Sequence, residues 1–156
     1  MSAFRIVWAT GILFFVAAIA FPSNSSARTR QNGQTLYVPA YAYIYHGNKE
    51  AKINVTTTLS VRNTSRTESI RITSLEFFDT DGKLLRRYDD LPAVMNPLQS
   101  LRYVISLDDD SGGSGANFIL KWEADRAVDV PIVESIMLGT GSSYGFAFVS
   151  QAVPIQ

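Results

Sequence analysis

Short runs in which apolar and polar residues alternate recur along this sequence, and they constrain its fold more than any other feature. The clearest run follows a glycine-rich loop, where Phe118, Leu120, Trp122 and Ala124 share one parity and polar residues occupy most of the other. A period of two places the apolar side chains on one face of a β-strand. We therefore expect a half-buried strand here, with its apolar face in a core.

Turn signals separate further runs of the same kind, and no stretch after residue 35 shows a sustained helical period. The motif DTDG at residues 79–82 predicts the turn of a hairpin. Ile72 and Leu75 lie on opposite parities of one run, which predicts either a β-bulge near residues 73–74 or a change of sheet there. These patterns predict an all-β protein, an antiparallel β-sandwich of about 7–8 strands with immunoglobulin-like topology.

The amino-terminal segment is typical of an export signal. Residues 6–21 are apolar throughout and contain no ionisable side chain, and Pro22 follows them. The run is shorter than the roughly 20 residues of a spanning helix, and Ser25 and Ala27 are small residues suited to a cleavage site. We expect a helical signal peptide over residues 1–27; an uncleaved anchor is the alternative, and membrane contact is expected through this segment alone.

The rest of the chain is expected to be exported, periplasmic or secreted. Residues 28–34 are polar and predict a linker, and residues 35–156 are enough for a single domain. There is no cysteine, which excludes disulfides, thiol catalysis and a cysteine-linked lipid anchor. The 14 basic and 14 acidic residues balance, so no nucleic-acid partner is expected. We expect no cofactor.

Tyrosines occupy every second position, with one gap, in the first strand of this domain. Tyr37, Tyr41, Tyr43 and Tyr45 share a parity opposite to aliphatic residues, and Pro39 predicts an edge strand or a break. Four such rings are suited to stacking on sugars or packing against a partner protein. The alternative is that they face the interior or cover the sheet through cross-strand aromatic pairs.

The loop before Phe118 combines acids, glycines and serines. Asp108, Asp109 and Asp110 precede Ser111 and Ser114, and the glycines between them predict a flexible loop without regular structure. The carboxylates and loop carbonyls suit calcium, although adjacent acids in an extended chain cannot all reach one ion. A solvated run of charge is the favoured interpretation, with a calcium-stabilised binding module as an alternative.

One histidine limits the possibilities for catalysis. His46 with Ser111 or Ser114 is a conceivable hydrolase arrangement, but GGSGA misses the G-x-S-x-G spacing of a nucleophile elbow. We therefore expect a non-catalytic protein and keep the hydrolase as an alternative. Glu134 shares parity with apolar neighbours and is expected either to pair with an arginine while half-buried or to mark an edge.

Four motifs together resemble a family of bacterial exported proteins, domain-of-unknown-function family 3124. They are LYVPAYAYIYHGNKE (residues 36–50), SLEFFDTDGKLLRRY (74–88), SGGSGANFILKW (111–122) and PIVESIMLGT (131–140). The resemblance covers nearly all of the domain. It implies a small secreted or envelope-attached protein and no catalytic residue, and this chain differs from the lipoprotein-like relatives in lacking a cysteine.

The sequence thus predicts an exported envelope module that binds a partner or has a structural role, without catalysis. The expected partner is an unknown envelope protein or a glycan. The candidate ligand-binding residues are Tyr37, Tyr41, Tyr43, Tyr45, His46, Asp108, Ser111, Ser114, Asn117 and Glu134, and the weaker calcium candidates are Asp108, Asp109 and Asp110.

Overall fold

The computed structural model describes residues 29–91, 93–140 and 145–155. The expected signal peptide, residues 1–27, lies outside the described residues. Within the described part, no helix has the length and apolar character needed to cross a membrane. The elements are β1 (Arg30–Pro39), β2 (Tyr43–His46), β3 (Ala51–Asn54), β4 (Thr56–Arg62), β5 (Ile70–Phe78), β6 (Leu84–Arg87), β7 (Ala93–Met95), β8 (Ser100–Ile105), the 3-10 helix η1 (Gly113–Gly115), β9 (Asn117–Asp129), β10 (Ile132–Thr140), β11 (Gly145–Gln151) and β12 (Val153–Ile155).

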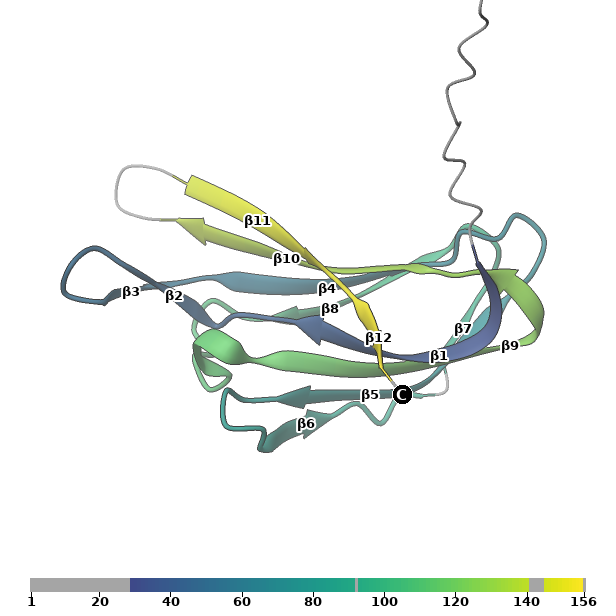
Figure 1. The fold of residues 1–156 in the computed structure, drawn as a ribbon, viewed down its shortest axis with the longest axis horizontal. Helices are drawn as coiled ribbons and strands as arrows, with labels where there is room; N and C mark the ends of the chain where they lie inside the picture. Colours follow the sequence, from purple (N-terminus) through teal and green to yellow (C-terminus); the bar gives the residue numbers. More distant parts are fainter. Residues whose placement is uncertain (1–28, 92, 141–144, 156) are drawn as a thin grey trace, which may run out of the picture.

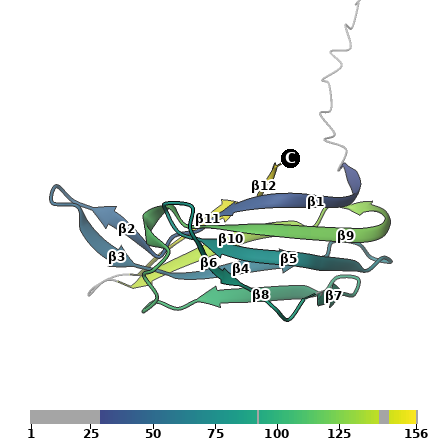
Figure 2. The same ribbon diagram turned by 90° about the horizontal axis from the view of Figure 1, so that it is seen from below.

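Two antiparallel sheets pack face to face and confirm the predicted all-β sandwich (Figures 1 and 2). The first sheet has the order β12-β1-β9-β5-β6, with β7 also paired to β5, and we call it sheet A. The second, sheet C, has the order β11-β10-β4-β8. A separate hairpin, β2–β3, projects from one end of the sandwich (Figure 1).

The chain crosses between the sheets in the way an immunoglobulin domain does. It passes from β4 in sheet C to β5 in sheet A, and later from β8 in sheet C to β9 in sheet A. The β4–β8 and β5–β9 pairs therefore correspond to the B–E and C–F pairs of that fold. β1 lies beside β9, where an immunoglobulin domain has its last strand, and β10 lies beside β4.

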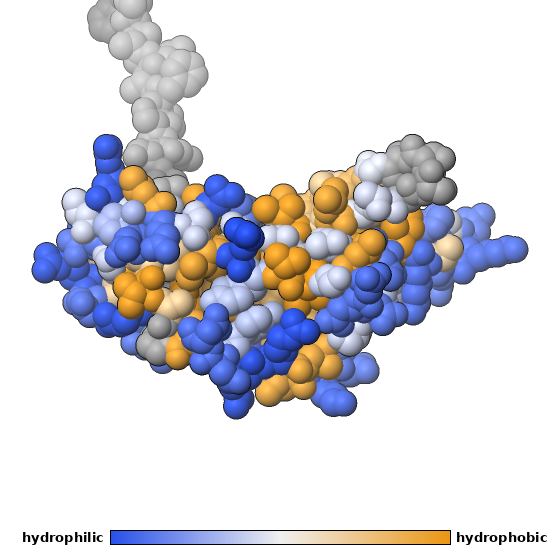
Figure 3. Space-filling view, turned by 180° about the vertical axis from the view of Figure 1, so that it is seen from behind, coloured by the Kyte–Doolittle hydropathy of each residue, from blue (hydrophilic) through white to orange (hydrophobic). Residues whose placement is uncertain are grey.

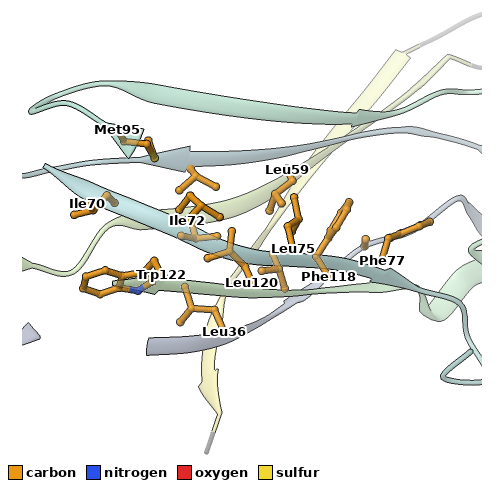
Figure 4. Packing of buried hydrophobic residues seen from close by; sticks show 14 of the residues in the cluster. Leu36, Leu59, Ile70, Ile72, Leu75, Phe77, Met95, Phe118, Leu120 and Trp122 are labelled. Atoms are coloured by element: carbon orange, nitrogen blue, oxygen red, sulfur yellow. The ribbon is translucent and has the colours of Figure 1, made fainter. Parts of the chain in front are cut away.

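The inward faces of both sheets form one apolar core (Figure 4). Phe118, Leu120 and Trp122 of β9 are fully buried, as their parity predicted. Leu59 of sheet C lies opposite them, because every second residue of β4 also points inward. Burial of side chains this large contributes about 1.5–3 kcal/mol each, so this layer is the main source of stability.

The bulge predicted in β5 is confirmed. The register with β9 shifts between Ile72 and Ser74, and this shift lets both Ile72 and Leu75 point into the core.

The DTDG hairpin is confirmed as well, because β5 and β6 flank it and Gly82 has a φ of 79°. Asp79 Oδ1 accepts hydrogen bonds from the backbone N–H of Asp81 at 3.0 Å and of Lys83 at 2.8 Å, which closes the turn.

The polar segment before residue 35 is not a linker. Residues 30–34 form the first half of β1 and pair with β9, from Arg30 opposite Asp129 to Gln34 opposite Trp122. Glycine is needed in this segment, because a Cβ on Gly33 would lie 2.7 Å from the Trp122 carbonyl oxygen. Ladder hydrogen bonds hold a polar strand at this position without an apolar side chain, so the alternating pattern did not reveal it. β9 likewise continues to Asp129, and Val128 near its end is fully buried in the core.

The tyrosine-rich run is two strands rather than one. β1 ends at Pro39, which cannot donate a ladder hydrogen bond, and the chain turns before β2 begins at Tyr43. Ala42 N–H instead donates to the Gly113 carbonyl at 2.8 Å, and Val55 N–H donates to the Ala42 carbonyl at 3.0 Å. The second contact also separates β3 from β4.

Candidate functional site

A polar groove of about 320 Å³ lies at the end of the sandwich from which the β2–β3 hairpin projects. The hairpin supplies one wall, and the other parts come from the β5–β6 turn and the loop between β8 and β9. We call it the tyrosine–aspartate groove. Its lining residues are Tyr43, Tyr45, Asp79, Thr80, Asp81, Asp110, Ser111, Gly112, Gly113 and Ser114.

Tyr43 and Tyr45 form the aromatic wall of the groove. Their ring centroids are 5.5 Å apart at an interplanar angle of 80°, an edge-to-face contact. Lys52 lies opposite Tyr45 in the hairpin register and places its Nζ 4.1 Å from the centroid of the Tyr43 ring. Hydrogen bonds from Tyr45 and then Lys52 lower the pKa of Tyr43, whereas the bond to Tyr43 raises the pKa of Tyr45 and of Lys52. The three side chains thus form one cluster, joined by the ring contact and by the lysine over the Tyr43 ring.

Thr80 holds the loop that forms the floor of the groove. Its Oγ1 donates to the Gly112 carbonyl at 3.1 Å and accepts from Gly115 N–H at 3.0 Å. Its own N–H also donates to the Gly112 carbonyl, at 3.0 Å. The loop was expected to be flexible and without regular structure; that expectation is wrong, because it contains η1 and is hydrogen-bonded on both sides.

The glycines of this loop permit close packing rather than motion. A Cβ on Gly112 would lie 2.8 Å from both the Phe77 ring and the Ala116 Cβ. Gly113 has a φ of 76°, and a Cβ there would overlap Thr80 Oγ1. Only glycine therefore lets the loop approach the β5–β6 turn this closely.

The acids around the groove divide into structural and uncommitted groups. Asp109 bonds to Arg86 at 3.2 Å and accepts from Ser111 Oγ at 2.5 Å, and Asp79 closes its own turn. For Asp81 and Asp110, no side-chain hydrogen bond or ion pair is found among the described residues. These two carboxylates line the groove and are available to accept hydrogen bonds from a ligand.

The hydrolase and the calcium site considered as alternatives each require side chains that converge on one point. Across the described ranges, no group of three or more histidine, cysteine, aspartate or glutamate residues has the geometry to hold a metal ion. His46 is exposed at the end of β2, opposite Ala51, and does not line the groove. The Ser111 hydroxyl donates to Asp109 rather than to an imidazole.

The structure brings together five residues singled out from the sequence. Tyr43, Tyr45, Asp110, Ser111 and Ser114 line the groove. Missed were the aspartates and threonine of the DTDG turn, residues 79–81, which were treated only as a turn, and Lys52. The polar loop that follows β5 and the polar loop that precedes β9 could have located them, because β5 ends at Phe78 beside Asn117, where β9 begins.

Several predicted residues lie elsewhere. Tyr37 pairs with Ile119 on the outer face of sheet A, and Asn117 pairs with Pro39 at the start of β9. Tyr41 makes an edge contact with Phe148 at 5.5 Å. Asp108 is exposed and outside the groove.

Glu134 fits the first of its two expected roles. Its side chain is only 18% exposed and lies 3.8 Å from Arg62. It also accepts a hydrogen bond from Gln151 Nε2 at 2.9 Å. The glutamate is therefore a half-buried member of a polar row across sheet C and is remote from the groove.

Comparisons with known proteins give a family and a distant structural likeness. Residues 33–155 match the model of a family described as "Protein of unknown function (DUF3124)". A comparison with curated proteins gives no match. A crystal structure of Thermotoga maritima 1070 is 12% identical and covers 77% of this chain and 92% of its own chain, with a TM-score of 0.47.

Proposed function

The chain belongs to the DUF3124 family, and we propose that it is an exported, non-catalytic binding module. Its ligand is a neutral or cationic carbohydrate held in the tyrosine–aspartate groove. The observation that carries this proposal is the meeting of an aromatic pair with two uncommitted carboxylates, Asp81 and Asp110, in one groove.

Carbohydrates require this combination of groups. A sugar ring presents C–H groups on its faces and hydroxyls at its rim, so it stacks on aromatic rings and donates hydrogen bonds to carboxylates. Tyr45 is 49% exposed and offers a ring face at the mouth of the groove. Ser114 adds a hydroxyl, and loop backbone groups complete a polar floor.

The charge of the groove favours one class of glycan. Asp79, Asp81 and Asp110 line it, while Lys52 beside Tyr43 is the one cation in contact with its aromatic wall among the described residues. The excess of negative charge disfavours a polyanionic ligand, because like charges in a confined groove repel. Neutral sugars and amino sugars are therefore the preferred ligands.

The absence of catalysis and the location remain parts of the proposal. The separation of His46 from the groove and the bond between Ser111 and Asp109 support a binding role over a hydrolase. The apolar leader over residues 6–21 supports export. Amino-terminal sequencing of the protein from an envelope fraction should begin at Arg28; a chain retained in the cytoplasm would contradict export.

Binding is tested with a panel of neutral, amino and acidic oligosaccharides, followed by calorimetric titration of each one that binds. We expect Tyr45→Ala and Asp110→Asn each to weaken binding by at least about tenfold, the equivalent of 1.4 kcal/mol. Tyr37→Ala and Asp108→Asn are matched controls, because both lie outside the groove, and they should leave affinity unchanged.

Three outcomes would count against the carbohydrate site. One is that no oligosaccharide binds at millimolar concentration. A second is that acidic oligosaccharides bind best, which would contradict the charge argument. The third is that the control substitutions weaken binding as much as those in the groove, which would place the ligand elsewhere.

A further inference from the structure

β11 is an edge strand of sheet C that lacks the usual protection against pairing with another chain. Its residues, Gly145–Gln151, include no charged side chain and no proline. Proteins normally protect an exposed edge with charge, proline, a bulge or a very short strand. An unprotected strand of seven residues therefore needs an explanation.

The other edges of sheets A and C in the described residues carry such protection, and β7 has only three residues. β12 has three residues and contains Pro154. β6 contains Arg86 and Arg87, and its register with β5 shifts between Phe77 and Phe78. β8 carries Arg102 at the opposite edge of sheet C. β11 is the exception.

Both faces of β11 also carry apolar side chains. Phe146 and Phe148 point toward the sandwich but remain half-buried, stacked on each other at 6.4 Å. Ala147 and Val149 point outward, and Val149 is 52% exposed. Apolar side chains also lie in patches among polar ones on the side of the molecule that Figure 3 shows. A partner strand at this edge would thus cover apolar side chains on both faces.

The outward side chains of β11 begin a row that crosses sheet C. Val149 pairs with Ile136, Ile136 with Thr58, and Thr58 with Val104 on the far edge. The neighbouring row holds Ala147 beside Leu138, which is 51% exposed. Neither the Val149–Ile136 pair nor the Ala147–Leu138 pair contains a charged residue.

We propose that two copies of this chain associate by antiparallel pairing of their β11 strands, so that two four-stranded sheets become one continuous sheet. With the two-fold axis at the middle residue, Phe148, Ala147 of one copy lies beside Val149 of the other. The row that starts at Leu138 in one copy then continues through Ile136 to Val104 in the second. Such an interface is isologous, because the same strand serves both copies.

Among the edge strands of sheets A and C that are longer than three residues, charge permits pairing with a second copy at β11 and opposes it at β8 and β6. Two identical strands meet without like-charge contact only when they carry no charge near the axis. Pairing β8 with itself would bring Arg102 of each copy together, and pairing β6 with itself would do the same for Arg86 and Arg87. β11 avoids this repulsion, and identical edges are present at equal concentration.

Two valines at opposite edges of one row provide the test. Val149→Lys places a charge on the proposed interface, and Val104→Lys places the same charge on β8, where the exposed fraction is nearly equal at 48% against 52%. Sedimentation equilibrium of the full chain, with a detergent that keeps residues 6–21 in solution, measures the dimer dissociation constant. Circular dichroism confirms that each variant is folded.

We expect a dimer of the wild-type chain, a rise of at least about tenfold in its dissociation constant for Val149→Lys, and no change for Val104→Lys. Equal weakening by both variants would indicate packing of one sheet face on another and would overturn the proposal. A monomeric wild-type chain, or a dimer insensitive to Val149→Lys, would overturn it as well.

Cross-linking checks the position of the two-fold axis independently. The chain has no cysteine, so Ala147→Cys and Val149→Cys introduce single thiols. Opposed residues in antiparallel strands have Cα atoms about 4.5–5.5 Å apart, which a disulfide spans. Mixing the two variants should give more oxidised dimer than either alone; a lack of any cross-link in the mixture would contradict this register.

Discussion

Gly113→Ala tests the account of the groove floor through its effect on stability. The backbone at Gly113 has a φ of 76°, a region that an alanine enters at a cost of about 1–2 kcal/mol. The added Cβ would also overlap Thr80 Oγ1, so the threonine side chain must rotate away.

Rotation of Thr80 has a second cost that follows from its contacts. Its Oγ1 would lose the bonds to the Gly112 carbonyl and to Gly115 N–H, each worth about 0.5–1.5 kcal/mol. Adding these to the backbone term gives a loss of about 2–5 kcal/mol in the free energy of unfolding. With a urea slope of about 1.5 kcal/mol per molar, the unfolding midpoint should fall by roughly 1.3–3.3 M.

Two other glycines separate the backbone term from the steric term. Gly47 and Gly82 also have positive φ, 67° and 79°, but a Cβ at either position would meet nothing within 4 Å. Gly47→Ala and Gly82→Ala should therefore lose only about 1–2 kcal/mol in the same urea titration. If Gly113→Ala is no more destabilising than these controls, Thr80 does not hold the loop as described.

Two further predictions concern stability. Asn63 is 2% exposed and places Nδ2 within 3.2 Å of the carbonyl oxygens of Glu68, Met95 and Asn96. Asn63→Ala should therefore lower the free energy of unfolding, measured in urea, by about 2–4 kcal/mol. Asn54→Ala is an exposed control with one long bond of 3.3 Å, and it should lower the same free energy by less than about 0.5 kcal/mol. Similar losses of unfolding free energy in both variants would show that the buried hydrogen bonds of Asn63 stabilise the fold no more than an exposed one. The bond to Arg71 lowers the pKa of Asp125 below 3.8, so the ion pair stabilises the folded state above about pH 4 and the stabilisation is lost as pH falls through the lowered pKa. The urea midpoints of wild type and Asp125→Asn should therefore differ at pH 7 and converge as the pH falls through the lowered pKa of Asp125. A difference that persists in strong acid would show that the substitution acts through something other than the lost charge.

Much of the fold follows from parity alone. Phe118, Leu120 and Trp122 were placed in the core because a strand exposes alternate faces, and the break in parity between Ile72 and Leu75 located a bulge that the register shift confirms. Side-chain polarity carries this information only where a strand buries one face. The polar half of β1 is held by backbone ladder hydrogen bonds, so its composition contains no signal of strand structure.

The site was predictable in parts but not as a unit. Tyrosines, aspartates and serines were recognised as candidates, yet Tyr43 and Asp110 meet only because a proline ends β1 and redirects the chain to Gly113. The rigidity of the loop was missed for a related reason. Glycine signals freedom in an isolated sequence, whereas here it permits contact with Thr80 of a distant turn.

The course of β1 also determines how the groove is displayed. The strand starts at Arg30 at one end of the sandwich and reaches Pro39 at the end that carries the groove (Figure 1). At about 3.3 Å per residue, its 10 residues span roughly 30 Å. Any tether attached before Arg30 would therefore hold the groove on the far side of the domain, where it reaches outward from the anchoring surface and stays accessible to large ligands.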